Sequence, residues 1–285
     1  MPSLESLGLH VSPSTSPDHY PGVTASTSCL VTRSWLYRLE AEQGCEIGAW
    51  NVQLDGGPLG AQGRQSLDAV LTSTNVATMS QRHPTLAVGS NAAPAQLESK
   101  FGLATGISDI VPLTRVTVKG IGVGHSAHVS KQGYVAYAPV VRDIESELFM
   151  LWLDDAQLAH IHVTEPNYMP ISLEADDFPA KLESGELVAR YQLYRSKWGA
   201  LSMGSEALPA TTQEKIMLAL AKVPALMAMV PELNDGYRAA ALALAGDEVL
   251  RMHVREAMSH EDLVIQDGLQ ERQTARQLIA AQKEV

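Results

Sequence analysis

Three small residues, Gly89, Ser90 and Asn91, join a short apolar run that ends at Val88 to a stretch with helical spacing. A strand that enters a helix through glycine leaves backbone N–H groups unpaired at the helix start, and these groups, with the helix dipole, favour an anion. Glycine also lets a ligand approach the backbone closely. The alternative is a simple turn in which serine or asparagine caps the helix. The segment therefore predicts either an anion-holding loop or a plain turn.

A single glutamate, Glu165, ends a second short helical pattern and stands directly before Pro166. The helix dipole disfavours a carboxylate at this position, and a partly buried carboxylate there would suit a general base. The alternative is an exposed glutamate at the start of a loop. Taken alone, Glu165 does not decide between the two.

Two pairs of histidines are the remaining candidates for chemistry. In a helix, residues two apart point to different faces, so His160 and His162 are poorly placed to share a metal ion. No cysteine accompanies them, and we expect no metal site. We expect His125 and His128 to form local hydrogen bonds or to line a cleft. The run KGIGVG matches a dinucleotide fingerprint only loosely, since no helical pattern follows it, so no cofactor is expected.

Composition limits the class of protein. The chain has 285 residues, 45% of them hydrophobic, and a formal net charge of −11. Because it has no excess of lysine and arginine to displace counterions, nucleic acid is an unexpected partner. No apolar run approaches the roughly 20 residues of a membrane helix, so no membrane partner is expected. Two cysteines without a motif favour a reducing, cytoplasmic location.

Composition also divides the chain into four stretches. Residues 1–28 are rich in serine, threonine and proline and predict a flexible arm. Residues 29–84 carry strand patterns, a glycine-rich turn and a weak helical pattern near 65–82, and form an N-terminal attachment. Residues 85–200 alternate strands and short helices and form the core. Residues 205–285 are helical throughout, with prolines as punctuation.

Within the core, the pattern predicts a buried strand before Gly89 and a helix over 94–101, with Pro94 in its first turn and Gly102 after its end. Strands follow over 109–124 and on both sides of a charged turn at 142–147. A short helix begins after Asp154 or Asp155 and stops at Pro166. Further strands are expected near 169–173 and 188–196.

Taken in order, these features resemble the gamma-glutamylcyclotransferase-like superfamily over about residues 86–196. That family is marked by a Tyr-Gly-Ser-Asn loop, a strand pair after a glycine, and a catalytic glutamate at the end of the following helix. The positions of this sequence that match these features are Gly89, Ser90, Asn91, Gly133, Ala136, Pro139 and Glu165. The chain departs from the pattern at Val88, where the family has tyrosine, at Phe149-Met150, where it has Trp-Gly, and at Pro166, where it has glycine.

The resemblance implies an α+β fold. Its core would be a small mixed β-barrel, six- or seven-stranded and partly closed, with peripheral helices and here an added C-terminal helical segment. The implied reaction is intramolecular aminolysis: the α-amine of a γ-glutamyl group attacks its own γ-carbonyl and gives 5-oxoproline and a free amine. Glu165 would be the acid/base. Loop N–H groups would hold a carboxylate or the oxyanion. Val88 and Asn91 belong to the same loop and would also bind substrate. From their positions in the chain, we further expect His125, His128, Tyr168 and Tyr191 to line the substrate-binding pocket.

Two functions remain open at this stage. The first is such an enzyme, acting on a γ-glutamyl amide or related amine as its small-molecule substrate. The second is a catalytically inactive small-molecule-binding or protein-interaction module on the same fold, which the departures at Val88 and Pro166 motivate. An open cleft facing Glu165 would favour the first, and a cleft filled by the arm beside Gly89 the second. The small apolar residues of 238–254 suggest a homodimer through the C-terminal helices, or packing on their own barrel.

Overall fold

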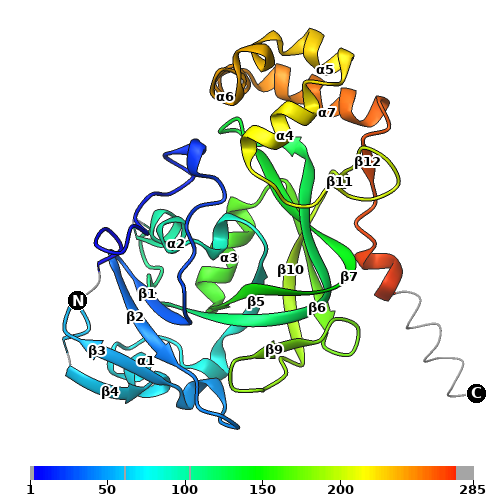
Figure 1. Cartoon of the computed structure of the whole chain (residues 1–285). Helices are drawn as coiled ribbons and strands as arrows, with labels where there is room; N and C mark the ends of the chain where they lie inside the picture. Colours follow the sequence, from blue (N-terminus) through cyan, green and yellow to red (C-terminus); the bar gives the residue numbers. More distant parts are fainter. Residues whose placement is uncertain (1–2, 61, 103, 274–285) are drawn as a thin grey trace, which may run out of the picture.

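The computed structural model describes residues 3–60, 62–102 and 104–273. Its twelve strands form one mixed sheet whose main path runs β4-β3-β2-β1-β6-β7-β5-β10-β8, with β9, β11 and β12 attached off this path. Helices flank the sheet, and a group of helices stands at one end of it (Figure 1). The α+β class is therefore confirmed. Six of the twelve strands lie within residues 83–196, the region where six or seven were expected, and the described pairings do not close the path into a barrel.

The elements have the following bounds. The strands are β1 (Cys29–Thr32), β2 (Trp35–Glu40), β3 (Asn51–Asp55), β4 (Gln62–Ser66), β5 (His83–Ala87), β6 (Val111–Val129), β7 (Val135–Leu153), β8 (Tyr168–Glu174), β9 (Ala180–Leu182), β10 (Arg190–Ser196), β11 (Ala200–Leu201) and β12 (Val264–Ile265). The α-helices are α1 (Leu67–Ser73), α2 (Pro94–Phe101), α3 (Asp155–Thr164), α4 (Gln213–Leu220), α5 (Pro224–Met229), α6 (Tyr237–Gly246) and α7 (Glu248–His260).

The spine of the sheet is a long hairpin made by β6 and β7, each of 19 residues. The two strands predicted on either side of a turn at 142–147 are wrong, because β7 runs through this stretch without a break. The pairs Val118↔Ser146 and Lys119↔Glu145 continue the ladder across it. A register shift next to Gly120, which has φ +88°, bends the hairpin there. Backbone pairing thus overrides the local charge pattern.

The elements around the proposed loop are as predicted. Strand β5 leads through Gly89 into a one-turn 3-10 helix, η4 (Ser90–Ala92), and then into α2. Pro94 stands in the first turn of α2. Helix α3 has Asp154 as its N-cap, in a reciprocal capping box with Gln157. The helical pattern near 65–82 gives the short α1 and a one-turn 3-10 helix, η3 (Met79–Gln81).

The N-terminal segment 3–28 packs on the core and is not the loose arm that its composition suggested. Leu4 is fully buried. The Ser12 and Ser14 hydroxyls both donate to Oε1 of Gln96 in α2, at 2.7 and 2.9 Å. Tyr20 stacks on Tyr134 with ring centroids 4.0 Å apart. Hydrophobic burial and these hydrogen bonds fix a segment that has no periodic pattern of its own.

Helices α4 to α7 form a cap over the end of the β6–β7 hairpin (Figure 1). Their apolar faces share one core cluster with Val135 of β7 and Leu201 of β11. At the hairpin tip, a Cβ on Gly133 would lie 2.0 Å from the backbone oxygen of Ala241 in α6, so the cap approaches very closely. The helical expectation for this region is confirmed for α4 to α7, but Val264–Ile265 pairs with β11 as a strand. Residues 274–285 lie outside the described part of the chain.

None of the described helices combines the length and the apolar character that crossing a membrane requires.

Candidate active site

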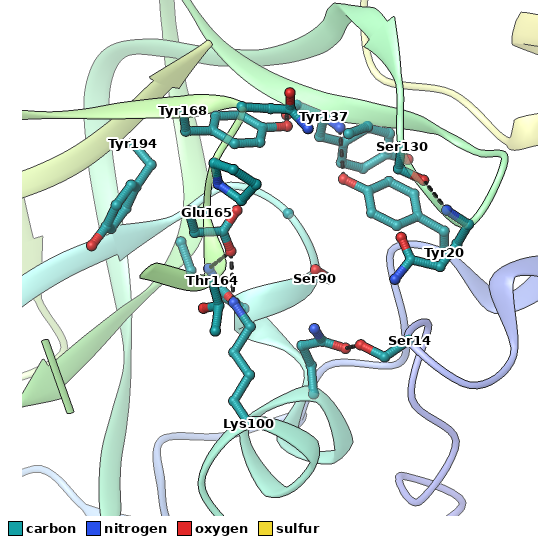
Figure 2. A pocket seen from close by; sticks show the side chains of 18 of the residues that line it. Ser14, Tyr20, Ser90, Lys100, Ser130, Tyr137, Thr164, Glu165, Tyr168 and Tyr194 are labelled. Carbon is teal, nitrogen blue, oxygen red and sulfur yellow. Dashed lines mark hydrogen bonds and ion pairs between the residues drawn. The ribbon is translucent and has the colours of Figure 1, made fainter. Parts of the chain in front are cut away.

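A cleft of about 700 Å³ opens between the loop after β5, the tip of the β6–β7 hairpin, the end of α3 and the N-terminal segment. Five tyrosines from four parts of the chain line it: Tyr20, Tyr134, Tyr137, Tyr168 and Tyr194. Figure 2 shows Tyr20, Tyr137 and Tyr168 along one side and Glu165 with Lys100 below them. The charged residues among the described lining are Lys100, Lys131 and Glu165. The cleft thus has an aromatic wall and a small charged floor.

The Gly-Ser-Asn loop forms one edge of this cleft. A Cβ on Gly89 would lie 3.0 Å from the Tyr20 hydroxyl and 3.7 Å from Cβ of Tyr137, so the backbone here is closely covered. The N–H groups of Ser90 and Asn91 stand at the start of η4, where the helix itself offers no acceptor for them. The predicted turn is therefore present, and no hydrogen bond from these two N–H groups is found among the described residues.

Glu165, the C-cap residue of α3, lies against this loop. Its Oε1 accepts a hydrogen bond from Nδ2 of Asn91 at 2.9 Å. The same oxygen forms an ion pair with Nζ of Lys100 at 2.7 Å. The Lys100 and Glu165 side chains are 9% and 17% exposed. The structure thus brings together the loop and the glutamate, the two halves of the site that the sequence suggested, although 74 residues separate them.

The two oxygens of Glu165 differ in their surroundings. Oε1 takes both contacts, whereas no side chain or backbone group of the described residues donates to Oε2. Asn91 has a similar imbalance, since its Oδ1 is buried and has no hydrogen-bond partner in the described structure. The arrangement holds the carboxylate in place through one oxygen and leaves the other to meet a proton donor.

The tyrosines are tied to the hairpin through one peptide segment. Tyr137 donates its backbone N–H to the Tyr20 hydroxyl at 2.6 Å, and its carbonyl accepts from the Tyr168 hydroxyl at 2.6 Å. Burial raises the pKa of Tyr20 well above its usual value. Burial, and secondarily the charge of Glu165, does the same to the pKa of Tyr168. Both phenols therefore stay protonated at neutral pH, with the Tyr168 hydroxyl as a hydrogen-bond donor and the Tyr20 hydroxyl as an acceptor.

Most of the predicted site residues line the cleft: Val88, Gly89, Ser90, Asn91, His128, Glu165 and Tyr168. Two do not. His125 is fully buried, and its Nε2 accepts from the backbone N–H of Thr211 at 3.0 Å. Tyr191 is buried in the main core and donates to the carbonyl of Phe178 at 2.8 Å.

Strand geometry accounts for these two corrections. Successive side chains on a regular strand face opposite sides, so residues three apart point away from each other. His125 and His128 both lie on β6, whose register with β7 shifts between His125 and Val129, and only His128 lines the cleft. Tyr191 and Tyr194 are related in the same way on β10, where Tyr194 lines the cleft. The sequence pattern predicts the strand but not which of its two faces lies toward the cleft, so Tyr191 was predicted as a site residue instead of Tyr194.

His128 belongs to a buried chain of polar side chains. Its Nδ1 is 2.5 Å from Oγ of Ser126, and that oxygen is 2.6 Å from Oγ of Ser196. Burial, and secondarily the positive charge of Arg255, lowers the pKa of His128 to about 3. The imidazole is therefore neutral at physiological pH and contributes a hydrogen bond, not a charge, to the wall of the cleft.

The other histidine pair diverges as expected. His160 lines the cleft and lies 5.8 Å from the ring of Phe101, whereas Nδ1 of His162 is 2.7 Å from the Tyr194 hydroxyl. Among the residues that the structure describes, no three histidine, cysteine, aspartate or glutamate side chains are grouped as metal ligands.

The sequence analysis missed several residues of the site, among them Tyr20, Lys100, Tyr134, Tyr137 and Tyr194. Lys100 is a basic residue in the last turn of α2, and that position by itself indicates only a favourable interaction with the helix dipole. Tyr20 lies in a segment without periodicity. No spacing rule links either residue to Glu165, so only the folded chain could identify them.

Comparison of the sequence with models of known families finds no match, and comparison with curated proteins finds none. Solved structures do match. Over about half its length, the chain resembles a gamma-glutamyl cyclotransferase. That match covers 61% of this chain and 99% of the other, at 11% identity and a TM-score of 0.34. An uncharacterized protein from Homo sapiens matches at 13% identity and a TM-score of 0.34, over 50% of this chain and 82% of its own chain.

A protein from Arabidopsis thaliana matches at 14% identity and a TM-score of 0.33, over 54% of this chain and 93% of its own. At these identities the likeness says nothing about substrate or mechanism. The chemistry of the cleft therefore has to follow from its own residues.

Proposed function

We propose that this protein is an enzyme of the gamma-glutamylcyclotransferase kind, which cleaves a γ-glutamyl amide or related amine by intramolecular aminolysis. The observation that carries the proposal is the position of Glu165. Its carboxylate lines the cleft beside the Gly-Ser-Asn loop, anchored through Oε1 and with Oε2 without a donor among the described residues. A carboxylate so placed is suited to move protons for a bound substrate.

The proposed reaction begins with a substrate whose α-ammonium gives a proton to Oε2 of Glu165. The free α-amine then attacks the γ-carbonyl carbon, forming the new C–N bond of a five-membered ring. The bond to the leaving nitrogen breaks, and 5-oxoproline and an amine result. Of the three ammonium protons the ring nitrogen keeps one, and Glu165 passes the other two in turn to the leaving nitrogen, which departs as an ammonium ion.

The site supports this chemistry in two further ways. The N–H groups of Ser90 and Asn91 are free to donate to the oxygen of the γ-carbonyl as negative charge develops on it. The nucleophile and the carbonyl belong to the same molecule, so the substrate itself removes much of the entropic barrier. Since Glu165 carries both protons, the proposed mechanism requires no cofactor.

The test is release of 5-oxoproline from a panel of γ-glutamyl amides with amine and amino-acid leaving groups, measured by mass spectrometry. Glu165→Gln keeps the size of the side chain and removes the base, so we expect kcat/KM to fall by roughly 10²- to 10⁴-fold. Glu98→Gln makes the same change in α2 at a residue that does not line the cleft, so it is the matched control and should keep full activity. Equal turnover by wild type and Glu165→Gln would remove Glu165 from the mechanism.

A second candidate is a binding module without catalysis on the same fold. The observation that favours it is the packing of Tyr20 from the N-terminal segment against Gly89, which narrows the cleft at the loop. This alternative predicts saturable binding of a γ-glutamyl amide with no 5-oxoproline from any member of the panel.

A further inference from the structure

The charged floor of the cleft is an ion pair that has few other partners. Nζ of Lys100 and Oε1 of Glu165 are 2.7 Å apart, and both side chains are largely buried. Lys100 reaches this point from the last turn of α2, and its side chain has no other hydrogen-bond or ion-pair partner among the described residues (Figure 2). The other lysine of the lining, Lys131, is exposed at the hairpin tip. Lys100 is therefore the cation beside the proposed base.

Opposite charges held side by side in a cleft match a ligand that carries both charges itself. The α-amino-acid head has an ammonium and a carboxylate on one carbon. Such a ligand can exchange partners with the pair, so that its ammonium meets Glu165 and its carboxylate meets Lys100. A ligand that offers only one of the two charges leaves the other protein charge partly buried and unpaired, which is strongly unfavourable.

We propose that Lys100 is the residue that selects substrates with a free α-carboxylate, by giving up its ion pair with Glu165 and binding that carboxylate. The inference rests on the proposed function and adds the specificity determinant of its site. It assigns the ammonium to Oε2 of Glu165, the carboxylate to Lys100 and the γ-carbonyl to the loop. The substrate class is thus a γ-glutamyl compound with an unblocked zwitterionic head.

A second observation points to the same ligand. Oδ1 of Asn91 is a buried acceptor without a partner in the described structure, while Nδ2 of the same amide holds Glu165. Buried acceptors are nearly always satisfied, so this one indicates a missing N–H donor. An ammonium bound at Glu165 would bring N–H groups next to this amide. No N–H donor is available from a ligand whose α-nitrogen is blocked by acylation.

Partner exchange also changes the contacts of the proposed base. Nζ of Lys100 lies 2.7 Å from Oε1 of Glu165, and this contact is given up when the substrate carboxylate takes over Lys100. Asn91 then remains the described side chain that holds Oε1 of Glu165.

The experiment compares paired substrates, the best γ-glutamyl amide of the panel and its α-carboxamide, in which the carboxylate charge is removed. We expect wild type to favour the free carboxylate at least tenfold in kcat/KM. Lys100→Met should lose this preference, mainly because KM for the substrate with the free carboxylate rises. Lys100→Arg retains the charge and should restore part of the preference. Lys181→Met removes an exposed lysine that does not line the cleft and should leave the preference unchanged. Thermal melting establishes that each variant folds.

Calorimetric binding of L-glutamine and L-glutaminamide separates this inference from the proposed function. If no γ-glutamyl amide is turned over, yet wild type binds L-glutamine at least tenfold better than L-glutaminamide and Lys100→Met does not, the reaction is wrong and the carboxylate site stands. A folded Lys100→Met variant that keeps the wild-type preference would overturn the inference. So would wild-type protein that binds both probes equally or binds neither.

Discussion

The side chains at the floor and back of the cleft are held by specific partners. Glu165 is fixed through one oxygen by Asn91 and Lys100, and His128 is fixed through Nδ1 by Ser126. A histidine that is buried in its neutral form lowers the stability of the folded chain at a pH at which the same histidine would be protonated in the unfolded chain. His128 and His125 are the clearest examples, since burial lowers their pKa values to about 3 and about 4.

These histidines predict a loss of stability in weak acid. In the unfolded chain both titrate near 6.5. Above that pH neither state binds the protons, so stability is unaffected. As the pH falls below 6.5, the two histidines of the unfolded chain bind protons, whereas the buried histidines of the folded chain stay neutral. The free energy of unfolding therefore drops by about 4 kcal/mol by pH 5. Urea unfolding at pH 7.5, 6 and 5 measures this.

His128→Gln supplies the control, because it keeps a polar partner for Ser126 and removes one titrating group. The acid-dependent loss should fall to about half. A wild-type protein whose stability does not change between pH 7.5 and 5 would contradict the buried, neutral state of both histidines.

At the scale of elements, the site depends on segments that meet only in three dimensions. The bent β6–β7 hairpin brings Tyr137 over the loop at Gly89, and the N-terminal segment adds Tyr20 between them. Helix α2 anchors that segment through Gln96, which is 6% exposed and accepts from two serine hydroxyls. Gln96 therefore holds part of the cleft wall without touching the proposed base.

Gln96→Ala should loosen the N-terminal segment. The buried hydroxyl of Ser12 and the partly buried hydroxyl of Ser14 lose their acceptor, and we expect a destabilisation of about 1–3 kcal/mol with faster proteolysis between residues 10 and 22. Chemical unfolding and limited proteolysis with mass mapping measure the two effects. Ser99→Ala, at an exposed position of the same helix, should change neither. Unchanged cleavage in Gln96→Ala would show that the segment is held by its apolar contacts alone.

At the scale of the whole molecule, the helical cap buries one apolar face on the hairpin and still exposes others. Most of its apolar residues pack in the cluster shared with β6, β7 and β11. Leu242 of α6 and Val249 of α7 remain 75% and 57% exposed. The structure thus accounts for packing of the helices on their own core, and leaves the homodimer as a proposal.

The proposed homodimer predicts a mass of about twice 30.7 kDa in size exclusion with light scattering. Exposed apolar side chains that meet across an interface stabilise it, so Leu242→Glu combined with Val249→Glu should give a monomer. Leu187→Glu, at a position of similar exposure away from the cap, should leave the mass unchanged. A wild-type mass of one chain would exclude this dimer at the concentration used.

Sequence patterns alone specified the parts of the site that local rules govern. Apolar runs, prolines and capping residues determined β5, α2 and α3, and with them the positions of Gly89 and Glu165 at the ends of their elements. They also led to the expectation that the loop and the glutamate would share one site, and the contact between Asn91 and Glu165 agrees with that expectation.

Tertiary structure decided the features that depend on side-chain orientation, strand pairing and contacts between residues far apart in the sequence. The charged stretch at 142–147 is part of a strand because β6 pairs with it. His128 lines the cleft and His125 does not, because side chains three positions apart on a strand face opposite sides. The N-terminal segment is ordered by burial that no local pattern encodes. Lys100 became the partner of Glu165 because α2 and α3 pack at one cleft, a proximity of residues 65 apart that no rule of spacing predicts.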